Sequence, residues 1–359
     1  MSSTALAHPR SASASILETP VLAGRGFAAG MVLFSTWIVI GSYLDAWAHR
    51  HVARLETFFT PWHAVLYSSV LATGLFLYVC LMRGRAAGRP WRTALPLGYG
   101  LSFVGFVLFG LGGGLDLGWH TVFGIERRYA ATLSPTHLLL MGSAALIVSG
   151  GLRAAWSSPS RRLGYAGLLS GTALLAILMF FSQDLHPFTS QWAANGAPAY
   201  LLNDQGEQLG VTEVILQTAF LVGIVLFLLS RFTLPPFALT ILVTLTTLGI
   251  VIIWHPDPVV AVGVIGGLLG DALRLLLRPD PSRPLALRAF AFLLPVGIYG
   301  PYFLGILRAD GIWWPVHAWT GAVVVAGITG VLLSYLVVPP SRPADSAATA
   351  IPRSLTRDG

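Results

Sequence analysis

Apolar residues occur along the chain in long runs that short polar segments separate. Each run holds about the ~20 residues that an α-helix needs to cross the ~30 Å hydrocarbon core of a bilayer. The runs cover residues 24–45, 61–82, 94–117, 135–156, 164–183, 211–230, 236–254, 258–276, 286–307 and 314–338. The pattern predicts an all-α, polytopic transmembrane helical bundle of about ten spans. The eighth run is short and is also compatible with a re-entrant segment.

The composition excludes a soluble globular protein. The chain has 359 residues, of which 55% are hydrophobic and only 10% are charged, and its mean hydropathy is +0.72. We expect a single transmembrane domain over residues 24–338, in contact with the lipid bilayer, between disordered cytoplasmic tails at 1–23 and 339–359. The first 20 residues are polar and lack an apolar centre, so they do not resemble a cleavable signal peptide.

Arginine supplies the positive charge of the side chains, because the chain contains no lysine. Most arginines lie in segments 83–92, 153–162 and 274–288 and near the termini, on every second loop. The positive-inside rule therefore predicts a multi-pass protein of the cell (inner or plasma) membrane with both termini in the cytoplasm. The net charge of +7 reflects this topology and anionic lipid headgroups. There is no soluble basic domain to bind nucleic acid.

The histidines lie on one side of the predicted topology. Apart from His8 in the N-terminal tail, all of them fall at span ends or loops of the extracytoplasmic side, namely His49, His51, His63, His120, His137, His186, His255 and His317. An amphipathic imidazole suits both membrane interfaces equally, so this one-sided distribution favours a shared role. Three of them, His186, His255 and His317, the last in a third Pro-x-His, are additional candidates for a larger site, with helix-end residues or neighbours of an aromatic belt as the alternative.

Two predicted hairpins, 24–82 and 94–156, repeat one arrangement of acid and histidines. Each first span ends with Asp and His four residues apart, on one face of a helix. Each second span opens with Thr or Ser, then Pro, one residue and His. Thr and Ser are typical N-caps and Pro a typical first helical residue, so the histidine can point back toward the Asp/His pair. The residues are Asp45, His49 and His63 in one hairpin and Asp116, His120 and His137 in the other.

Asp, His and His from two antiparallel helices predict a metal site with room for water or substrate. Imidazole and carboxylate without thiolate admit several metals, and the order of affinities favours copper, with zinc and iron as the main alternatives. The loop residues Arg54, Glu56 and Glu126 are candidates to orient the ligands or carry protons. The alternative interpretation is structural, with Ser/Thr-Pro starting a helix and Asp/His pairs bonding to helix ends.

The first hairpin resembles the C subunit of the copper membrane monooxygenase family, which includes particulate methane and ammonia monooxygenases. The residues that carry this resemblance are Asp45, Ala46, His49, Arg54, Phe59, Thr60, Pro61, His63 and Tyr67. The resemblance covers residues 45–137. It implies copper at Asp45, His49 and His63, and a second station at Asp116, His120 and His137 where the family has Asn in the acid position. It also implies other membrane subunits as partners.

These observations favour an enzyme, a copper-dependent monooxygenase-like oxidoreductase that oxidises or oxygenates an apolar, lipid-soluble small molecule. Asp45, His49 and His63 would be its catalytic ligands, and we expect the second station to be the looser one because its loop is longer. Three alternatives stay open at this point. They are a metal-handling protein or permease, a haem-binding protein, and an accessory subunit of a membrane oxidase.

Overall fold

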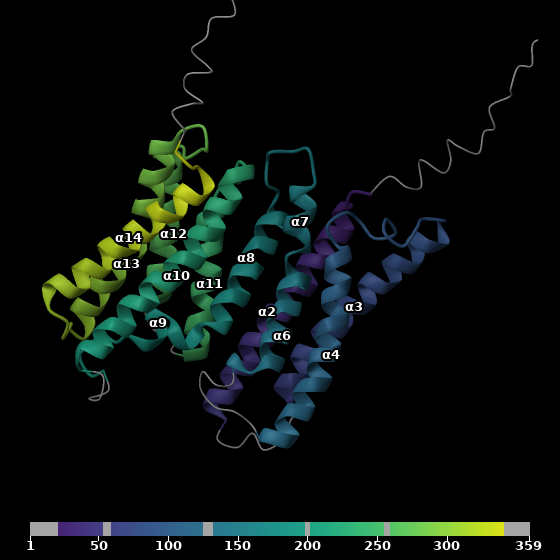
Figure 1. Ribbon diagram of the computed structural model, residues 1–359, viewed down its shortest axis with the longest axis horizontal. Helices are drawn as coiled ribbons and strands as arrows, with labels where there is room; N and C mark the ends of the chain where they lie inside the picture. Colours follow the sequence, from purple (N-terminus) through teal and green to yellow (C-terminus); the bar gives the residue numbers. More distant parts are fainter. Residues whose placement is uncertain (1–20, 53–58, 125–131, 198–201, 255–258, 341–359) are drawn as a thin grey trace, which may run out of the picture.

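The computed structural model describes residues 21–52, 59–124, 132–197, 202–254 and 259–340, and they form a helical bundle without a β-strand (Figure 1). The elements are α2 (Arg25–His51), α3 (Pro61–Ala86), α4 (Gly100–Phe123), α6 (Pro135–Val148), α7 (Gly150–Trp156), α8 (Tyr165–Phe181), η1 (Gln183–Leu185), α9 (Pro187–Ser190), α10 (Asp204–Arg231), α11 (Ala238–Trp254), α12 (Val259–Leu277), α13 (Pro284–Ala309) and α14 (Val316–Val337). Each of the ten predicted apolar runs overlaps one of these helices, or two in the cases of 135–156 and 164–183. The predicted all-α class is confirmed.

Among the described residues, seven helices are long and apolar enough to cross a membrane, namely α2, α3, α4, α10, α12, α13 and α14. The eighth predicted run is one of them, as α12. The pair α6 and α7 passes the same test together but is bent by 46°. Helices α8 and α11 are apolar but have only 17 residues each, at the short end of what crosses a bilayer. The chain is therefore a multi-pass helical membrane protein, and ten crossings stay a prediction.

The run predicted as one span at 135–156 is broken after Val148. Ser149 links α6 to α7, and the next two residues are glycines, a combination at which helices commonly kink. The bend brings Gly150 against α4, where an added Cβ would lie 2.4 Å from Oγ of Ser102 and 2.6 Å from the Tyr99 ring. A side chain at position 150 would therefore force these helices apart.

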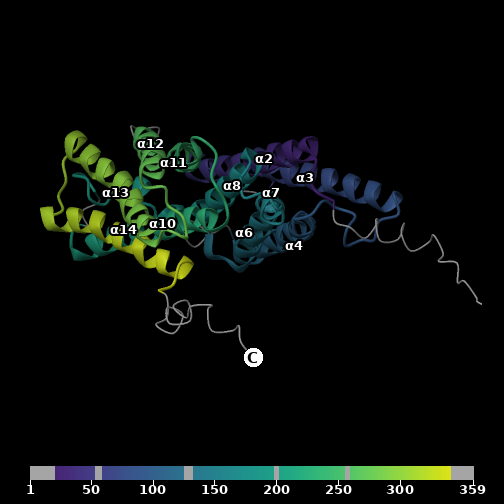
Figure 2. The same cartoon turned by 90° about the horizontal axis from the view of Figure 1, so that it is seen from above.

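The two hairpins, α2 with α3 and α4 with α6, pack against each other in one half of the bundle (Figure 2). Their shared core includes Ile38, Val70, Phe109 and Ile147, one from each helix. Lipid tails are as apolar as these side chains, so close packing rather than the hydrophobic effect holds such helices together. Helices α8 and α11 contact α2 and connect this half to α10 and α12–α14.

The ends of α2 and α4 and the starts of α3 and α6 lie on the same side of the bundle, the lower side in Figure 1. Helix α2 begins and α14 ends on the opposite side. This arrangement places both predicted Asp/His/His sets on one side of the molecule. Which side faces the cytoplasm is a prediction from the arginine distribution.

Candidate metal centres

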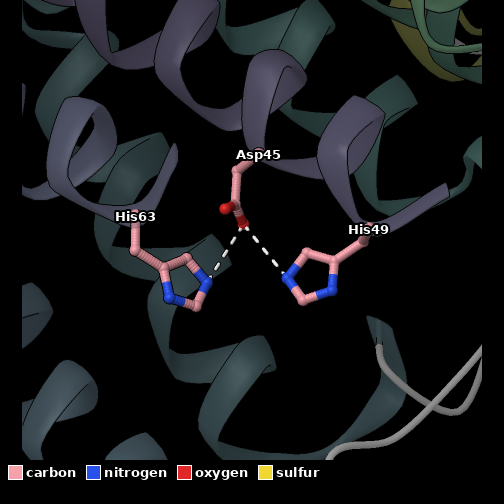
Figure 3. A group of neighbouring side chains, drawn as sticks. All are labelled: Asp45, His49 and His63. Carbon is pink, nitrogen blue, oxygen red and sulfur yellow. Dashed lines mark ion pairs between the residues drawn. The ribbon is translucent and has the colours of Figure 1, made fainter. Parts of the chain in front are cut away.

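Two groups of possible metal ligands occur among the described residues, and they comprise the six residues singled out by the repeat. Group 1 is Asp45, His49 and His63 (Figure 3), and group 2 is Asp116, His120 and His137. In each group, one ligand atom from every residue lies within 4.8 Å of the other two. The sequence therefore predicted which residues the fold brings together.

The local sequence explains how group 1 forms. Helix α2 continues past Asp45 and His49 and ends at His51. The aspartate and the histidine, four residues apart, therefore occupy one face of the helix. Thr60 caps α3, with Oγ1 accepting from the backbone N–H of His63 at 3.1 Å. Pro61 is the first helical residue and His63 the third. The cap fixes the start of α3 and turns His63 toward α2, as expected.

The carboxylate of Asp45 lies between the two imidazoles of group 1. Its Oδ2 is 3.7 Å from Nε2 of His49 and 3.3 Å from Nε2 of His63, and the two ring centroids are 5.6 Å apart. Figure 3 shows one nitrogen of each imidazole turned toward this oxygen. Typical N–H···O hydrogen bonds are about 2.9–3.0 Å long. Ligand atoms around a tetrahedral metal ion, each about 2.0–2.2 Å from it, lie about 3.3–3.6 Å apart.

The second oxygen of Asp45 is an orphaned acceptor. Its Oδ1 is buried and has no hydrogen-bond partner among the described residues. A buried carboxylate oxygen without a donor costs free energy, so native structures rarely leave one unpaired. A metal ion bound by the carboxylate would relieve this cost, since it neutralises the charge of the whole group.

Group 2 brings the same residue types together around a more buried acid, but here each carboxylate oxygen faces one imidazole. Asp116 is only 3% exposed. Its Oδ2 is 3.4 Å from Nε2 of His120, and its Oδ1 is 3.5 Å from Nδ1 of His137. The ligand atoms are therefore as close together as in group 1, although the sequence favoured a looser second station.

The two groups differ in the hydrogen bonds around the ligands. Thr136 donates its hydroxyl to Oδ1 of Asp116 at 2.7 Å, and Oγ of Ser134 lies 2.6 Å from Nδ1 of His137. Ser134 also caps α6. Group 2 is therefore held by hydroxyl groups on α6, whereas Asp45 has an orphaned oxygen. Sequence reasoning missed Thr136. The available signal was its place directly before His137 in Ser-Pro-Thr-His. The first hairpin has Trp62 at the corresponding position, so the repeat did not single out this hydroxyl.

His120 carries the strongest single argument for a cation in group 2. Its Nδ1 lies 3.1 Å from the carbonyl oxygen of Gly124, and a carbonyl only accepts, so Nδ1 carries the proton. In a neutral ring, Nε2 then presents a lone pair to Oδ2 of Asp116. Two acceptors repel, so a proton or a metal ion has to lie between them. A backbone carbonyl on the other ring nitrogen is the usual support of a metal-bound histidine.

The end of α2 is tied to the other half of the bundle by Arg50. Its guanidinium forms an ion pair with Asp184 of η1, with 2.5 Å between Nη2 and Oδ1. It also lies over the Trp254 ring of α11, 2.9 Å from the centroid. Both contacts involve residues far away in the chain, so nothing in the local sequence indicated them. They hold the last turn of α2, next to His49, in place.

Two further predicted site residues, His186 and His317, lie in the described part of the chain and join neither group. His186 is 2% exposed and caps α9, with Nδ1 accepting from the backbone N–H of Phe188 at 3.1 Å. Burial lowers the pKa of His186 to about 3, so the ring is neutral at physiological pH. His317 is exposed in the first turn of α14. The other predicted residues lie outside the described part of the chain: Arg54, Glu56, Glu126 and His255.

A buried acid elsewhere in the bundle has a structural role. Glu213 of α10 is 1% exposed and accepts hydrogen bonds from the Ser190 hydroxyl and, at 2.8 Å, from Nε1 of Trp192. Four residues later, Nε2 of Gln217 donates to the carbonyl of Leu185 at 2.8 Å. These bonds fasten the segment around η1 and α9 to α10.

Comparison with family models, with curated proteins and with solved structures found no match to this chain. The candidate metal centres therefore rest on their own geometry, and the resemblance to copper membrane monooxygenases stays a prediction.

Proposed function

We propose that this chain is an integral membrane metalloprotein that binds one transition-metal ion in each of its two Asp/His/His groups. The observation that carries the proposal is the repeated convergence. Two separate helical hairpins each bring a carboxylate and two imidazoles within 4.8 Å of one another. One such cluster is a common accident of helix ends, but the same cluster from the same positions of two hairpins supports a selected site.

The distances favour metal ligation over simple ion pairing. Three of the four Asp–His contacts, from Asp45 to His63 and from Asp116 to His120 and His137, are 3.3, 3.4 and 3.5 Å, and the fourth, from Asp45 to His49, is 3.7 Å. These separations are near the distance between two ligand atoms of a tetrahedral metal ion. They are longer than a typical charge-assisted hydrogen bond of about 2.7–2.9 Å. Haem fits poorly in group 1, because Oδ2 of Asp45 occupies the place between the two rings where a macrocycle would have to lie.

Copper is the metal we propose, with zinc and iron as alternatives. Each group offers two imidazole nitrogens and one carboxylate, and it has no thiolate, because the single cysteine, Cys80, lies more than four helical turns after His63. Such ligand sets bind copper most tightly among the divalent ions. Three protein ligands leave at least one position open for water or a substrate, which is typical of a catalytic rather than a structural site.

An oxidative reaction on an apolar substrate is the chemistry that this setting supports best. Exposed apolar side chains lie within a few residues of the ligands along the chain, at the ends of the helices, among them Phe59 at 81%, Val122 at 73% and Phe123 at 67%. A lipid-soluble molecule would reach them from the bilayer. Bound copper would supply dioxygen chemistry. Insertion of one oxygen atom into a C–H bond also consumes two electrons and two protons and releases water, so an external reductant or a further membrane subunit has to provide the electrons.

Metal analysis of the purified protein tests the proposal. After copper loading and removal of excess metal, the wild-type protein should hold about two copper ions and show nitrogen hyperfine structure in its electron paramagnetic resonance spectrum. His63→Ala and His137→Ala should each lose about one equivalent. His317→Ala is the matched control, since this exposed histidine belongs to neither group. Equal copper content in all four proteins would leave only the helix-capping interpretation.

A further inference from the structure

Tyr67 lies between the two candidate metal centres. It follows His63 by one turn of α3, and the two rings meet edge to face with their centroids 6.1 Å apart. On the other side the Tyr67 ring meets Phe109 of α4, at a centroid distance of 5.8 Å. The tyrosine therefore extends from group 1 across to the helix that carries Asp116.

A glycine of α4 makes room for the phenol. A Cβ added to Gly113 would lie 2.8 Å from Cε1 and 3.0 Å from the hydroxyl oxygen of Tyr67. Gly113 is three residues before Asp116, so the phenol rests on the helical backbone one turn from the acid of group 2. The neighbouring Gly114 faces open space, because nothing lies within 4 Å of a Cβ built there.

The two groups are linked through one tyrosine. The Tyr67 ring meets the ring of His63 in group 1, and its phenol lies against Gly113, three residues before Asp116 of group 2. Two cations bound in these groups would therefore lie close enough to interact electrostatically, and the burial of Asp116 would limit screening.

We infer that Tyr67, seated on Gly113, is a positioning residue shared by both groups, and that the two groups bind their ions as one coupled two-ion centre. The inference rests on the proposed function. A divalent ion in a group with one carboxylate leaves a net positive charge, so an ion in one group weakens binding in the other. Coupling free energies between sites commonly correspond to factors of 5–150 in affinity. We expect a factor of about five or more.

Titration with Cu²⁺ of the detergent-solubilised full chain measures this coupling. In the wild-type protein, the second Cu²⁺ should bind at least about fivefold more weakly than the single Cu²⁺ of either His63→Ala or His137→Ala. Equal affinities, with two independent steps in the wild-type protein, would overturn the inference and leave the proposed function intact. Failure of the wild-type protein to bind Cu²⁺ would overturn both.

The role of Tyr67 is tested by paired glycine variants. Gly113→Ala forces the phenol to shift and should alter the copper spectrum of both groups and change the ratio of the two affinities. Gly114→Ala, one residue along the same helix, should leave spectrum and ratio unchanged. In a Tyr67→Ala background the clash is absent, so Gly113→Ala should have no further effect. If Gly113→Ala and Gly114→Ala both left the copper spectrum and the ratio of the two affinities unchanged, the shared positioning role would be refuted.

Tyr67→Phe provides a test that preserves the packing of the ring. It should keep two copper ions per chain but change the ratio of the two affinities, because the hydroxyl next to α4 is lost. Tyr78→Phe is its control, since Tyr78 is on the same helix and 50% exposed. A ratio that is the same in Tyr67→Phe, Tyr78→Phe and the wild-type protein would contradict the inference even if Gly113→Ala does not fold.

Discussion

Arg50 of α2 and Asp184 of η1 form an ion pair across 134 positions of sequence, with 2.5 Å between Nη2 and Oδ1. Together with the stacking of Arg50 on Trp254, this pair joins the end of α2 that carries Asp45 and His49 to the segments around η1 and α11. The half that carries both candidate centres is thus anchored by a residue directly next to His49.

Replacing this anchor should loosen group 1. Arg50→Gln loses the ion pair and the cation–π contact, which together are worth about 1–2 kcal/mol at partly buried sites. We expect a lower unfolding temperature in detergent and weaker copper binding in group 1, with group 2 less affected. Arg308→Gln, at an exposed position near the end of α13, is the control. Equal unfolding temperatures for the two variants would show that the anchor is not important.

Thr136→Val should weaken copper binding in group 2 alone. The variant keeps the shape of the side chain but removes the hydroxyl that donates to Asp116 at 2.7 Å. Loss of a hydrogen bond to a metal ligand typically costs about 10–100-fold in affinity. Thr121→Val serves as the control, because this exposed hydroxyl on α4 donates to the Leu117 carbonyl at 2.7 Å. A loss of affinity in group 1 as well would point to general destabilisation.

The helix positions and the six residues of the two groups were predictable because they depend on local sequence. Apolar run length sets the spans, the spacing of Asp and His sets their common face, and Thr60-Pro61 and Ser134-Pro135 set the helix starts. Each of these features acts within a few residues. The predicted convergence of the six residues was therefore confirmed, because each group comes from two helices that are neighbours in the chain.

Features that depend on distant segments were not predictable. The packing of Gly150 against Ser102 and the place of Tyr67 against Gly113 each depend on a residue of another helix. His186 was a candidate ligand from its sequence neighbourhood, yet the fold buries it to 2% exposure, away from both groups. Only the packing of segments far apart in the chain decides these cases.

His186 should make the fold acid-sensitive. Its pKa is lowered to about 3 in the folded protein, whereas an unfolded histidine titrates near about 6.5. Its contribution to stability is therefore complete above pH ~6.5 and is lost as the pH falls toward 3, by at most about 1.4 kcal/mol per pH unit. His186→Asn, which can still cap α9, should show a flatter decline of unfolding temperature in chelator-treated samples. Parallel curves for both proteins would contradict this account.

Thiol labelling tests the predicted topology. In a Cys80→Ser background, single cysteines at the exposed polar positions His51 and Thr121 should react with an impermeant reagent added outside intact cells. Cysteines at Ala87 and Ser157, exposed at the other ends of the helices, should react only after lysis. The opposite pattern would place both candidate metal centres on the cytoplasmic side.

The most direct test of the central claim is anomalous diffraction at the copper edge from crystals of the copper-loaded protein. Two peaks are expected, one among Asp45, His49 and His63 and one among Asp116, His120 and His137. Each peak should lie about 2.0–2.2 Å from its nitrogen and oxygen ligands. The account would be contradicted by a map with no peak in either group and with each carboxylate hydrogen-bonded directly to its histidines.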